Sequence, residues 1–489
     1  MKHRFFRMFF AASLLWGAAA CTDFLEKEPL GLITEDAYFK TPEHAVEAVN
    51  AVYNMLRRWE VHVFSYIGMT DIISDDADKG STPTDASFLL ELENFSFNAT
   101  NIAPLSVWQG YYRGIHRANV AIERIPQIEM DAALRDRLVG EAKFLRGYFY
   151  FNLVRWFGDI PLITKPLPPD EFKQPRTSKE QVYAQIIKDL EEAAAALPVT
   201  YPPADRGRVT RGSANGMLAK VYLTLGDFQR TEQYALTVIN SGTYALFPNY
   251  ERLFQQEGQM SSESVFEVVT TADQQGLGGS QFNEVQGVRG VPNLGWGFNR
   301  PSDDLIRAYE PGDPRREATI LYVGEVLPDG TAIVEDNPET INERYNQKAW
   351  VPRRPDGRNG AGGGNIRILR YADVLLMAAE ALNENGKTQE ALTYLNQVRT
   401  RARGTRPATV LPNVTVTDRA QLRQRIWQER RVELAMEQQR WFDLLRQGRA
   451  GAVMKALGKN FQEGKHELFP IPQNEVDLSG GLITQNPNY

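Results

Sequence analysis

Three glutamates near the end of the sequence recur every four residues, a spacing that could place their carboxyl groups side by side on one helix. They are interspersed with arginines in the order Glu429, Arg430, Arg431, Glu433, Glu437 and Arg440. Paired carboxyls carry out the acid and base steps of glycoside hydrolysis, but the acid must keep its proton. Adjacent guanidinium groups favour the ionised carboxylate instead. The pattern therefore predicts ion pairs along an exposed helix face. No phosphate loop, catalytic Ser/His/Asp order or zinc motif in the sequence points to an enzyme or a cofactor.

A second acidic group contains Asp75, Asp76 and Asp78, just before Gly80. Alternating acids ahead of a glycine begin many calcium loops, but the bidentate glutamate that should follow is not at the required spacing. Residues 71–87 are polar and contain Gly and Pro, which is typical of a loop. We expect a solvated loop without a metal, whose three acids are candidates for ligand contact.

Aromatic residues in irregular sequence offer a different chemistry. Flat rings stack on the apolar faces of sugars, while nearby amides, carboxylates and guanidinium groups bind the hydroxyls. Trp296, Phe298 and Trp350 lie in irregular sequence near Gly and Pro and are the candidates for such stacking. Packing of each ring into its own loop is the alternative, since large aromatics are usually buried. Four other tryptophans fall on helical patterns and are predicted to be core: Trp108, Trp156, Trp427 and Trp441.

The N-terminal stretch indicates export and a membrane anchor. Lys2, Arg4 and Arg7 precede a short apolar run that ends in small residues at Cys21, the only cysteine. This is the layout of a secretory signal, and the run is too short to span a bilayer. A thiol at the cleavage point predicts removal of residues 1–20 and lipid attachment at Cys21, where two or more acyl chains anchor a protein stably. A plain secreted protein with a chance cysteine is the alternative.

The rest of the composition is typical of a globular protein. Hydrophobic residues make up 42% and charged residues 24%, and no later stretch is long and apolar enough for a membrane span. The formal charge of −6 becomes more negative when the basic leader is removed, so a nucleic-acid partner is not favoured. Because Cys21 is acylated in this interpretation and the five histidines are scattered, the sequence predicts neither disulfides nor a metal site.

Helical signals lie on both sides of an irregular middle region. Residues 42–56, 105–122, 134–157, 178–197 and 418–447 place apolar residues at 3.6-residue spacing, so we expect helices there.

One helical pattern occurs twice. The sequence AKVYLTLGDFQRTEQYALTVI surrounds Gly226, and AAEALNENGKTQEALTYLNQV surrounds Gly386. A helix, a glycine turn and a second helix form the tetratricopeptide type of hairpin, which buries its faces only by stacking on neighbours. These hairpins are predicted to be scaffold.

Between the two hairpins, residues 241–368 lose helical periodicity and contain Gly-rich runs and short β-like pieces. An irregular region of this length inside a protein is usually functional. We expect a mainly α-helical protein, in which a scaffold of about 35–240 and 369–460 supports a loop-rich ligand-binding half with a few short strands.

Several motifs resemble, in the same order, those of the SusD/RagB family of nutrient-binding lipoproteins. They are RGYFYFNLVRWFGDIPL at 146–162, RYADVLL at 370–376, ERRVEL at 429–434, RWFDLLR at 440–446 and FPIP at 469–472. The acidic stretch within residues 21–34, which we interpret as a tether, is also similar to the surface-export signal of lipoproteins in the Bacteroidetes lineage. The resemblance covers nearly all of the chain after Cys21.

The resemblance implies one SusD-like domain over residues 35–489, with about four tetratricopeptide-like hairpins. It implies a lipoprotein on the outer face of the outer membrane, paired with a SusC-like TonB-dependent transporter. Members act as a hinged lid that captures oligosaccharides or, in the RagB branch, peptides. We therefore expect a non-enzymatic protein that binds a nutrient glycan. A peptide-binding protein, a surface glycosidase and a structural partner of the transporter without a ligand are the alternatives.

Overall fold

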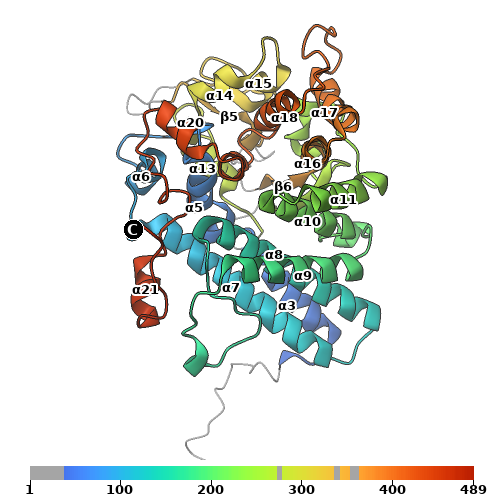
Figure 1. Ribbon diagram of the computed structural model, residues 1–489, viewed down its shortest axis with the longest axis vertical. Coiled ribbons are helices and arrows are strands. Elements are labelled where there is room, and N and C mark those ends of the chain that lie inside the picture. Colours follow the sequence, from blue (N-terminus) through green and yellow to red (C-terminus); the bar gives the residue numbers. More distant parts are fainter. Residues whose placement is uncertain (1–37, 272–277, 335–341, 353–362) are drawn as a thin grey trace, which may run out of the picture.

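The computed structural model describes residues 38–271, 278–334, 342–352 and 363–489 (Figure 1). The predicted leader, Cys21 and the acidic tether lie outside these residues, as do parts of both Gly-rich runs. Within the described ranges, none of the helices combines the length and the apolar character that crossing a bilayer requires.

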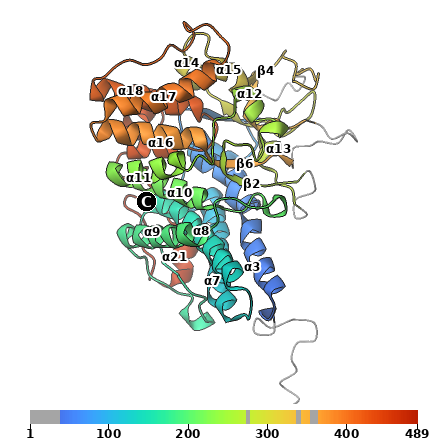
Figure 2. The same ribbon diagram turned by 90° about the vertical axis from the view of Figure 1, so that its right-hand side faces the viewer.

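Long helices form a stack of pairs that runs through the molecule (Figures 1 and 2). The pairs are α3 (Pro42–Met55) with α7 (Ile102–Arg124), α8 (Ala132–Phe157) with α9 (Lys179–Ala196), α10 (Arg211–Leu225) with α11 (Phe228–Asn240), and α16 (Tyr371–Glu384) with α17 (Thr388–Arg403). Contacts of α7 with α8, α9 with α10, and α11 with α16 join the pairs, and α18 (Arg419–Glu433) packs on α16. The prediction of a mainly α-helical protein with about four tetratricopeptide-like hairpins is confirmed.

Local sequence signals start and end these helices. The Thr41 side chain accepts a hydrogen bond from the backbone N–H of His44, and Ser178 caps α9 in the same way. At the hairpin turns, Gly226 and Gly386 have φ angles of 74° and 81°, a region that L side chains rarely adopt. A Cβ atom at either glycine would meet nothing within 4 Å, so backbone conformation rather than space requires glycine there.

The repeated positions of the two glycine hairpins are buried, which explains why they recur. Since α11 of the first hairpin contacts α16 of the second, each hairpin covers an apolar face of the other. Equivalent buried residues are Ala219 and Ala379, Tyr222 and Leu382, Thr231 and Ala391, Ala235 and Leu395, and Val238 and Val398.

Short elements build the irregular half. Within the described residues the strands form three antiparallel pairs: β1 (Ala77–Gly80) with β3 (Phe298–Pro301), β2 (Ser264–Val268) with β6 (Ile366–Arg370), and β4 (Ile320–Tyr322) with β5 (Arg344–Asn346). The short helices are α4 (Trp59–His62), α5 (Phe64–Ile67), α6 (Ser87–Asn94), α12 (Tyr250–Leu253), α13 (Phe282–Gln286), α14 (Asp303–Ala308), α15 (Pro314–Thr319), α19 (Arg440–Arg446), α20 (Ala450–Ala456) and α21 (Gln473–Ser479). The predicted loop-rich region with a few short strands is confirmed, although β1 comes from the N-terminal part of the chain.

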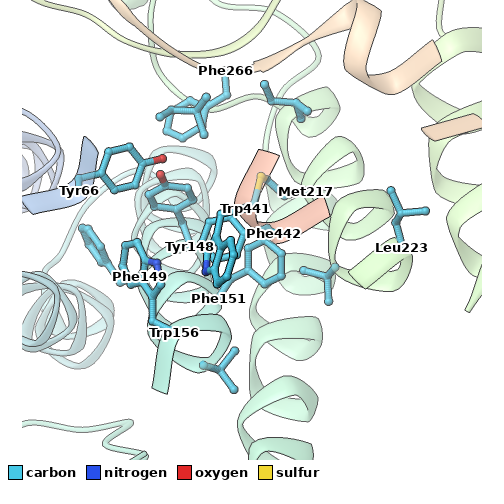
Figure 3. Packing of buried hydrophobic residues seen from close by; sticks show 14 of the residues in the cluster. Tyr66, Tyr148, Phe149, Phe151, Trp156, Met217, Leu223, Phe266, Trp441 and Phe442 are labelled. Atoms are coloured by element: carbon cyan, nitrogen blue, oxygen red, sulfur yellow. The ribbon is translucent and has the colours of Figure 1, made fainter. Parts of the chain in front are cut away.

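Aromatic side chains of α8 lie at the centre of the core. Phe149, Phe151 and Trp156 are at most 1% exposed, and Figure 3 shows them near Trp441 and Phe442 of α19. The guanidinium group of Arg155 lies 4.0 Å from the Phe151 ring centre and 3.5 Å from that of Phe442. The motif at 146–162 therefore encodes the meeting of α8 with the C-terminal part of the chain.

The predicted helix over residues 418–447 is wrong in its middle. α18 ends at Glu433, and α19 begins only at Arg440. Between them Met436 and Gln438 adopt positive φ, and the backbone N–H of Gln438 donates to the buried Asp71 carboxylate at 3.0 Å. The sequence of this segment has helical periodicity throughout. The helix is nevertheless interrupted where the backbone makes this contact with a distant part of the chain.

Three of the four tryptophans predicted to be core are buried, namely Trp108, Trp156 and Trp441. Trp427 is only half-buried, which corrects the prediction. Its indole N–H donates to the Glu380 carboxylate at 2.9 Å, so its polar edge has a partner while part of the ring stays exposed.

Candidate functional site

Aromatic side chains from distant parts of the sequence meet near the protein surface. They are Trp59, Phe64, Phe88 and Trp296, called here the aromatic cluster, and all four are half-buried. The ring centres of Trp59 and Trp296 are 5.8 Å apart, and Phe64 lies 5.2 Å from Trp59 and 6.1 Å from Trp296. Rings at these distances stabilise one another, and each keeps part of its surface open. Partly exposed aromatic faces of this kind suit the apolar faces of sugars.

Backbone contacts fix the loop that carries Trp296. The Trp296 N–H donates to the Glu284 carbonyl at 2.9 Å, and the Gly297 N–H donates to the Gly287 carbonyl at 2.9 Å. A Cβ atom at Gly295 would lie 2.2 Å from the Glu284 oxygen, so only glycine permits this approach. The direction of the Trp296 side chain is therefore determined by a well-bonded loop.

Phe298 lies behind the aromatic cluster. Its ring is 4% exposed and meets the Phe64 ring edge-on at 4.7 Å between centres. A buried ring cannot offer its face to a sugar. This placement corrects the prediction of Phe298 as a ligand contact, because the residue supports Phe64 from inside.

A partly exposed ion pair borders the aromatic cluster. Arg289 pairs with Asp85 and donates to Ser81 Oγ at 2.8 Å, and the two charged side chains are 30% and 39% exposed. The Arg289 Cβ is 3.1 Å from the position that a Cβ would take on Gly297, so the pair lies beside the Trp296 loop. Burial acts against ionisation of Asp85, but hydrogen bonds from Arg289 and neighbouring hydroxyls outweigh it and lower the pKa of that carboxyl. Fixed charged groups of this kind can bind the hydroxyls of a ligand.

Trp350 occupies a separate place in the irregular half. Its half-buried indole packs against an apolar group that contains Leu294, Leu321 and Tyr345. Among the described residues no ring contact joins it to Trp296. Trp350 stays a prediction as a ligand contact, outside the aromatic cluster.

The predicted solvated loop over residues 71–87 is wrong. Asp75 and Asp76 are 2% and 0% exposed. Arg440 donates to both carboxylate oxygens of Asp75 at 2.7 Å, and Arg431 donates to Asp76 at 2.8 Å. Arginines that lie more than 350 residues away thus neutralise these acids inside the protein, which corrects their assignment as ligand contacts.

The third acid of that group has a different environment. Asp78 is half-buried and pairs with Arg300 at 2.8 Å, the residue opposite it in the β1–β3 register. Within the described parts of the chain, no group of three or more His, Cys, Asp or Glu side chains could hold a metal ion. Asp78 stays a prediction as a ligand contact.

The regularly spaced glutamates of α18 and the turn after it are buried in a network of charged groups, called here the ion network. Its members are Glu263, Arg315, Lys348, Arg370, Arg399, Arg401, Glu429, Glu433 and Glu437. Glu433 accepts from Arg401 at 2.5 Å, from Arg370 at 3.1 Å and from Arg315 at 3.2 Å. The glutamates are ion-paired, but not with the arginines beside them in the sequence, because Arg430 pairs with Asp373, and Arg431 and Arg440 pair with Asp75. The predicted ion pairs along an exposed helix face are therefore wrong.

The electrostatics of the ion network do not suit acid catalysis. Burial opposes ionisation of Glu433, yet the charges of Arg401, Arg370 and Arg315 outweigh it and lower the pKa to about 2. Burial likewise opposes ionisation of Glu437, and Arg370 with Lys348 again lowers its pKa. Neither carboxyl holds a proton near neutral pH, as a general acid must.

Sequence reasoning missed Trp59 and Phe64. They lie in the short helices α4 and α5, directly after the regular pattern of α3 ends. A tryptophan directly after an amphipathic helix could have been recognised in the sequence as a candidate for ligand contact. Its partner Trp296, more than 200 residues away, could not be identified from local sequence.

The fold and the site define a class of protein: a helical-hairpin scaffold that supports a loop-built surface with partly exposed aromatic side chains. The family described as "Starch-binding associating with outer membrane" matches residues 33–223, and the family described as "SusD family" matches residues 262–489. The SusD-like protein P2 of Formosa agariphila is 30% identical over 97% of this chain and 98% of its own length. The chain belongs to the SusD family, which confirms the resemblance seen in the motifs.

Solved structures agree with this assignment. A laminarin binding SusD-like protein superposes with a TM-score of 0.80 and 32% identity, covering 92% of this chain and all of that one. The surface glycan-binding protein A from Bacteroides thetaiotaomicron, in complex with laminarihexaose, gives a TM-score of 0.78 with 25% identity and the same coverage of both chains.

Proposed function

We propose that this protein binds a nutrient glycan at the aromatic cluster without cleaving it. The observation that carries the proposal is the meeting of Trp59 and Trp296, two half-buried indoles with ring centres 5.8 Å apart, next to the Asp85–Arg289 pair. Aromatic faces beside fixed polar groups are the usual equipment for sugar binding.

The relatives support this choice of ligand. Two similar structures are named for binding laminarin or for a complex with laminarihexaose, so β-1,3-glucan oligosaccharides are the first candidates. The acids that a glycosidase would need are paired with arginines inside the protein, which supports a binder rather than an enzyme. A peptide-binding role, as in the RagB branch, is the second candidate within the same architecture.

Calorimetry with purified protein tests the function. We expect binding to at least one member of a panel that contains laminarin, starch and other polysaccharide fragments, and none to a mixture of short peptides. Chromatography of the incubated glycans should show no new products. Release of shorter sugars would refute the binding-only role, and binding to peptides alone would replace glycan with peptide as the ligand.

We propose further that lipid on Cys21 holds the protein on the outer face of the outer membrane, where it passes the glycan to a SusC-like TonB-dependent transporter. The basic leader, the apolar run and the single thiol support the anchor, and family membership supports the partner. Copurification of such a transporter from solubilised membranes tests the pairing, and a protein recovered alone would argue against it.

Replacing Cys21 by alanine is expected to remove the protein from the cell surface while leaving its fold intact, because the thiol is the lipid attachment point in this proposal. Surface labelling of intact cells measures the first effect, and the melting temperature of the purified protein measures the second. Substitution of nearby Thr22 by alanine is the control and should keep the protein at the surface. Full surface retention of the Cys21→Ala protein would exclude the anchor.

A further inference from the structure

A groove of about 280 Å³ lies between α3, residues 204–208 and the end of β2, and is called here the α3 groove. Figure 2 shows α3 and β2 on the same side of the molecule. Its lining includes Asn50, Tyr53, Asn54 and Arg57 from α3 or the turn that follows it. None of these residues belongs to the aromatic cluster.

Two amide groups in the α3 groove have fixed orientations. Arg208 donates to the Asn50 side-chain oxygen at 2.9 Å, and Arg57 donates to that of Asn54 at 2.7 Å. An arginine can only donate, so each amide must present its oxygen to the arginine and its NH₂ elsewhere. Neither NH₂ group donates a hydrogen bond within the described part of the chain.

The two amide side chains lie on one face of α3. Asn50 and Asn54 are four residues apart on one helix, which places their side chains on the same face about 5–6 Å apart. Tyr53, half-buried and three residues after Asn50, lies on the same face. Two spaced donors beside an aromatic ring suit an uncharged polyhydroxylated chain.

The α3 groove lies close to the aromatic cluster. Arg57 lines the groove, and Trp59 of the cluster is only two residues further, at most roughly 7 Å away between Cα atoms. The groove and the aromatic cluster are therefore close enough for one chain of sugar residues to reach both.

We infer that the α3 groove is a second subsite for the sugar residues of a neutral glycan beyond those stacked on Trp59 and Trp296, with Asn50 and Asn54 donating hydrogen bonds to its hydroxyls. This inference rests on the proposed glycan-binding function. It predicts that the α3 groove makes the protein bind long glycan chains more tightly than short ones.

Calorimetry with laminaritriose and laminarihexaose tests the inference. The Asn50→Asp/Asn54→Asp protein keeps an oxygen for each arginine and loses both NH₂ groups. Two lost hydrogen bonds should lower the affinity for laminarihexaose about 10-fold and leave that for laminaritriose unchanged. Asn50→Ala/Asn54→Ala should behave alike, and Asn240→Asp, at an exposed residue of α11, should change neither affinity.

Each other result contradicts the inference in a recognisable way. An unchanged affinity for laminarihexaose, or an equal loss of affinity for both sugars, would show that the α3 groove is not a subsite. The aromatic cluster would then remain the proposed site. A loss with the aspartates but not with the alanines would be an effect of added charge and would also overturn the inference. If the unmodified protein bound neither sugar nor any glycan of the panel, the proposed function itself would fail.

Discussion

Replacement of both Trp59 and Trp296 by alanine is expected to reduce glycan affinity by about 100-fold or more, because each ring supplies a stacking face and central aromatic side chains dominate binding energy. Calorimetry against the best glycan of the panel measures the loss. Each single substitution should give an intermediate effect, since the two rings contact one another and share the ligand.

The matched control for this experiment is Trp427→Ala. Trp427 is also half-buried, but it lies on α18 and bonds to Glu380, away from the aromatic cluster. The control should retain full affinity. The double variant should melt only a few degrees lower than the unmodified protein, because Trp59 and Trp296 are only half-buried. A double variant that binds glycan within a factor of three of the unmodified protein would exclude the cluster as the site.

Replacement of Glu433 by glutamine is expected to lower the free energy of unfolding by about 3–5 kcal/mol, since it removes one negative charge from a buried network in which three guanidinium groups share that carboxylate. Arg370, Arg401 and Arg315 all contact this carboxylate, and none of the three is more than 4% exposed at its side chain. Urea unfolding measures the change. Glu192→Gln, which breaks a partly exposed pair with Lys143, is the control and should cost less than about 1 kcal/mol.

The loss of stability caused by Glu433→Gln should become smaller as the pH falls. The pKa of Glu433 falls from 4.5 in the unfolded chain to about 2 in the folded protein, so its stabilising effect is complete above pH 4.5 and disappears as the pH falls toward 2. The difference between the unmodified protein and Glu433→Gln should narrow over that window. A difference that stays constant down to pH 2 would mean that the carboxylate charge is not what stabilises the fold.

Helices and their ends were predictable because they depend on neighbours in the sequence. Thr41 caps α3, Gly226 and Gly386 end their helices, and the buried faces repeat at helical spacing. The same reasoning located the irregular region, because a loss of periodicity is also local information.

The site was less predictable because its parts are distant in sequence. Trp296 was identified from its glycine-rich loop, but its contact with Trp59 depends on how α4 meets that loop. Asp75 has the local pattern of a solvated acid, yet Arg440, 365 residues later, neutralises it in the interior. Charge pairing across such separations is not encoded in spacing.

The position of the ion network has a consequence for how this protein could diversify. It joins Arg315 and Lys348 of the irregular half to Arg370 at the end of β6, Arg401 of α17 and Glu433 of α18. The charges that secure the irregular half are therefore buried, and none of them belongs to the aromatic cluster. Loop residues such as those around Trp296 can change in evolution without loosening this attachment. In this way one fold can acquire new ligand preferences while each loop substitution lowers the stability of the fold only slightly.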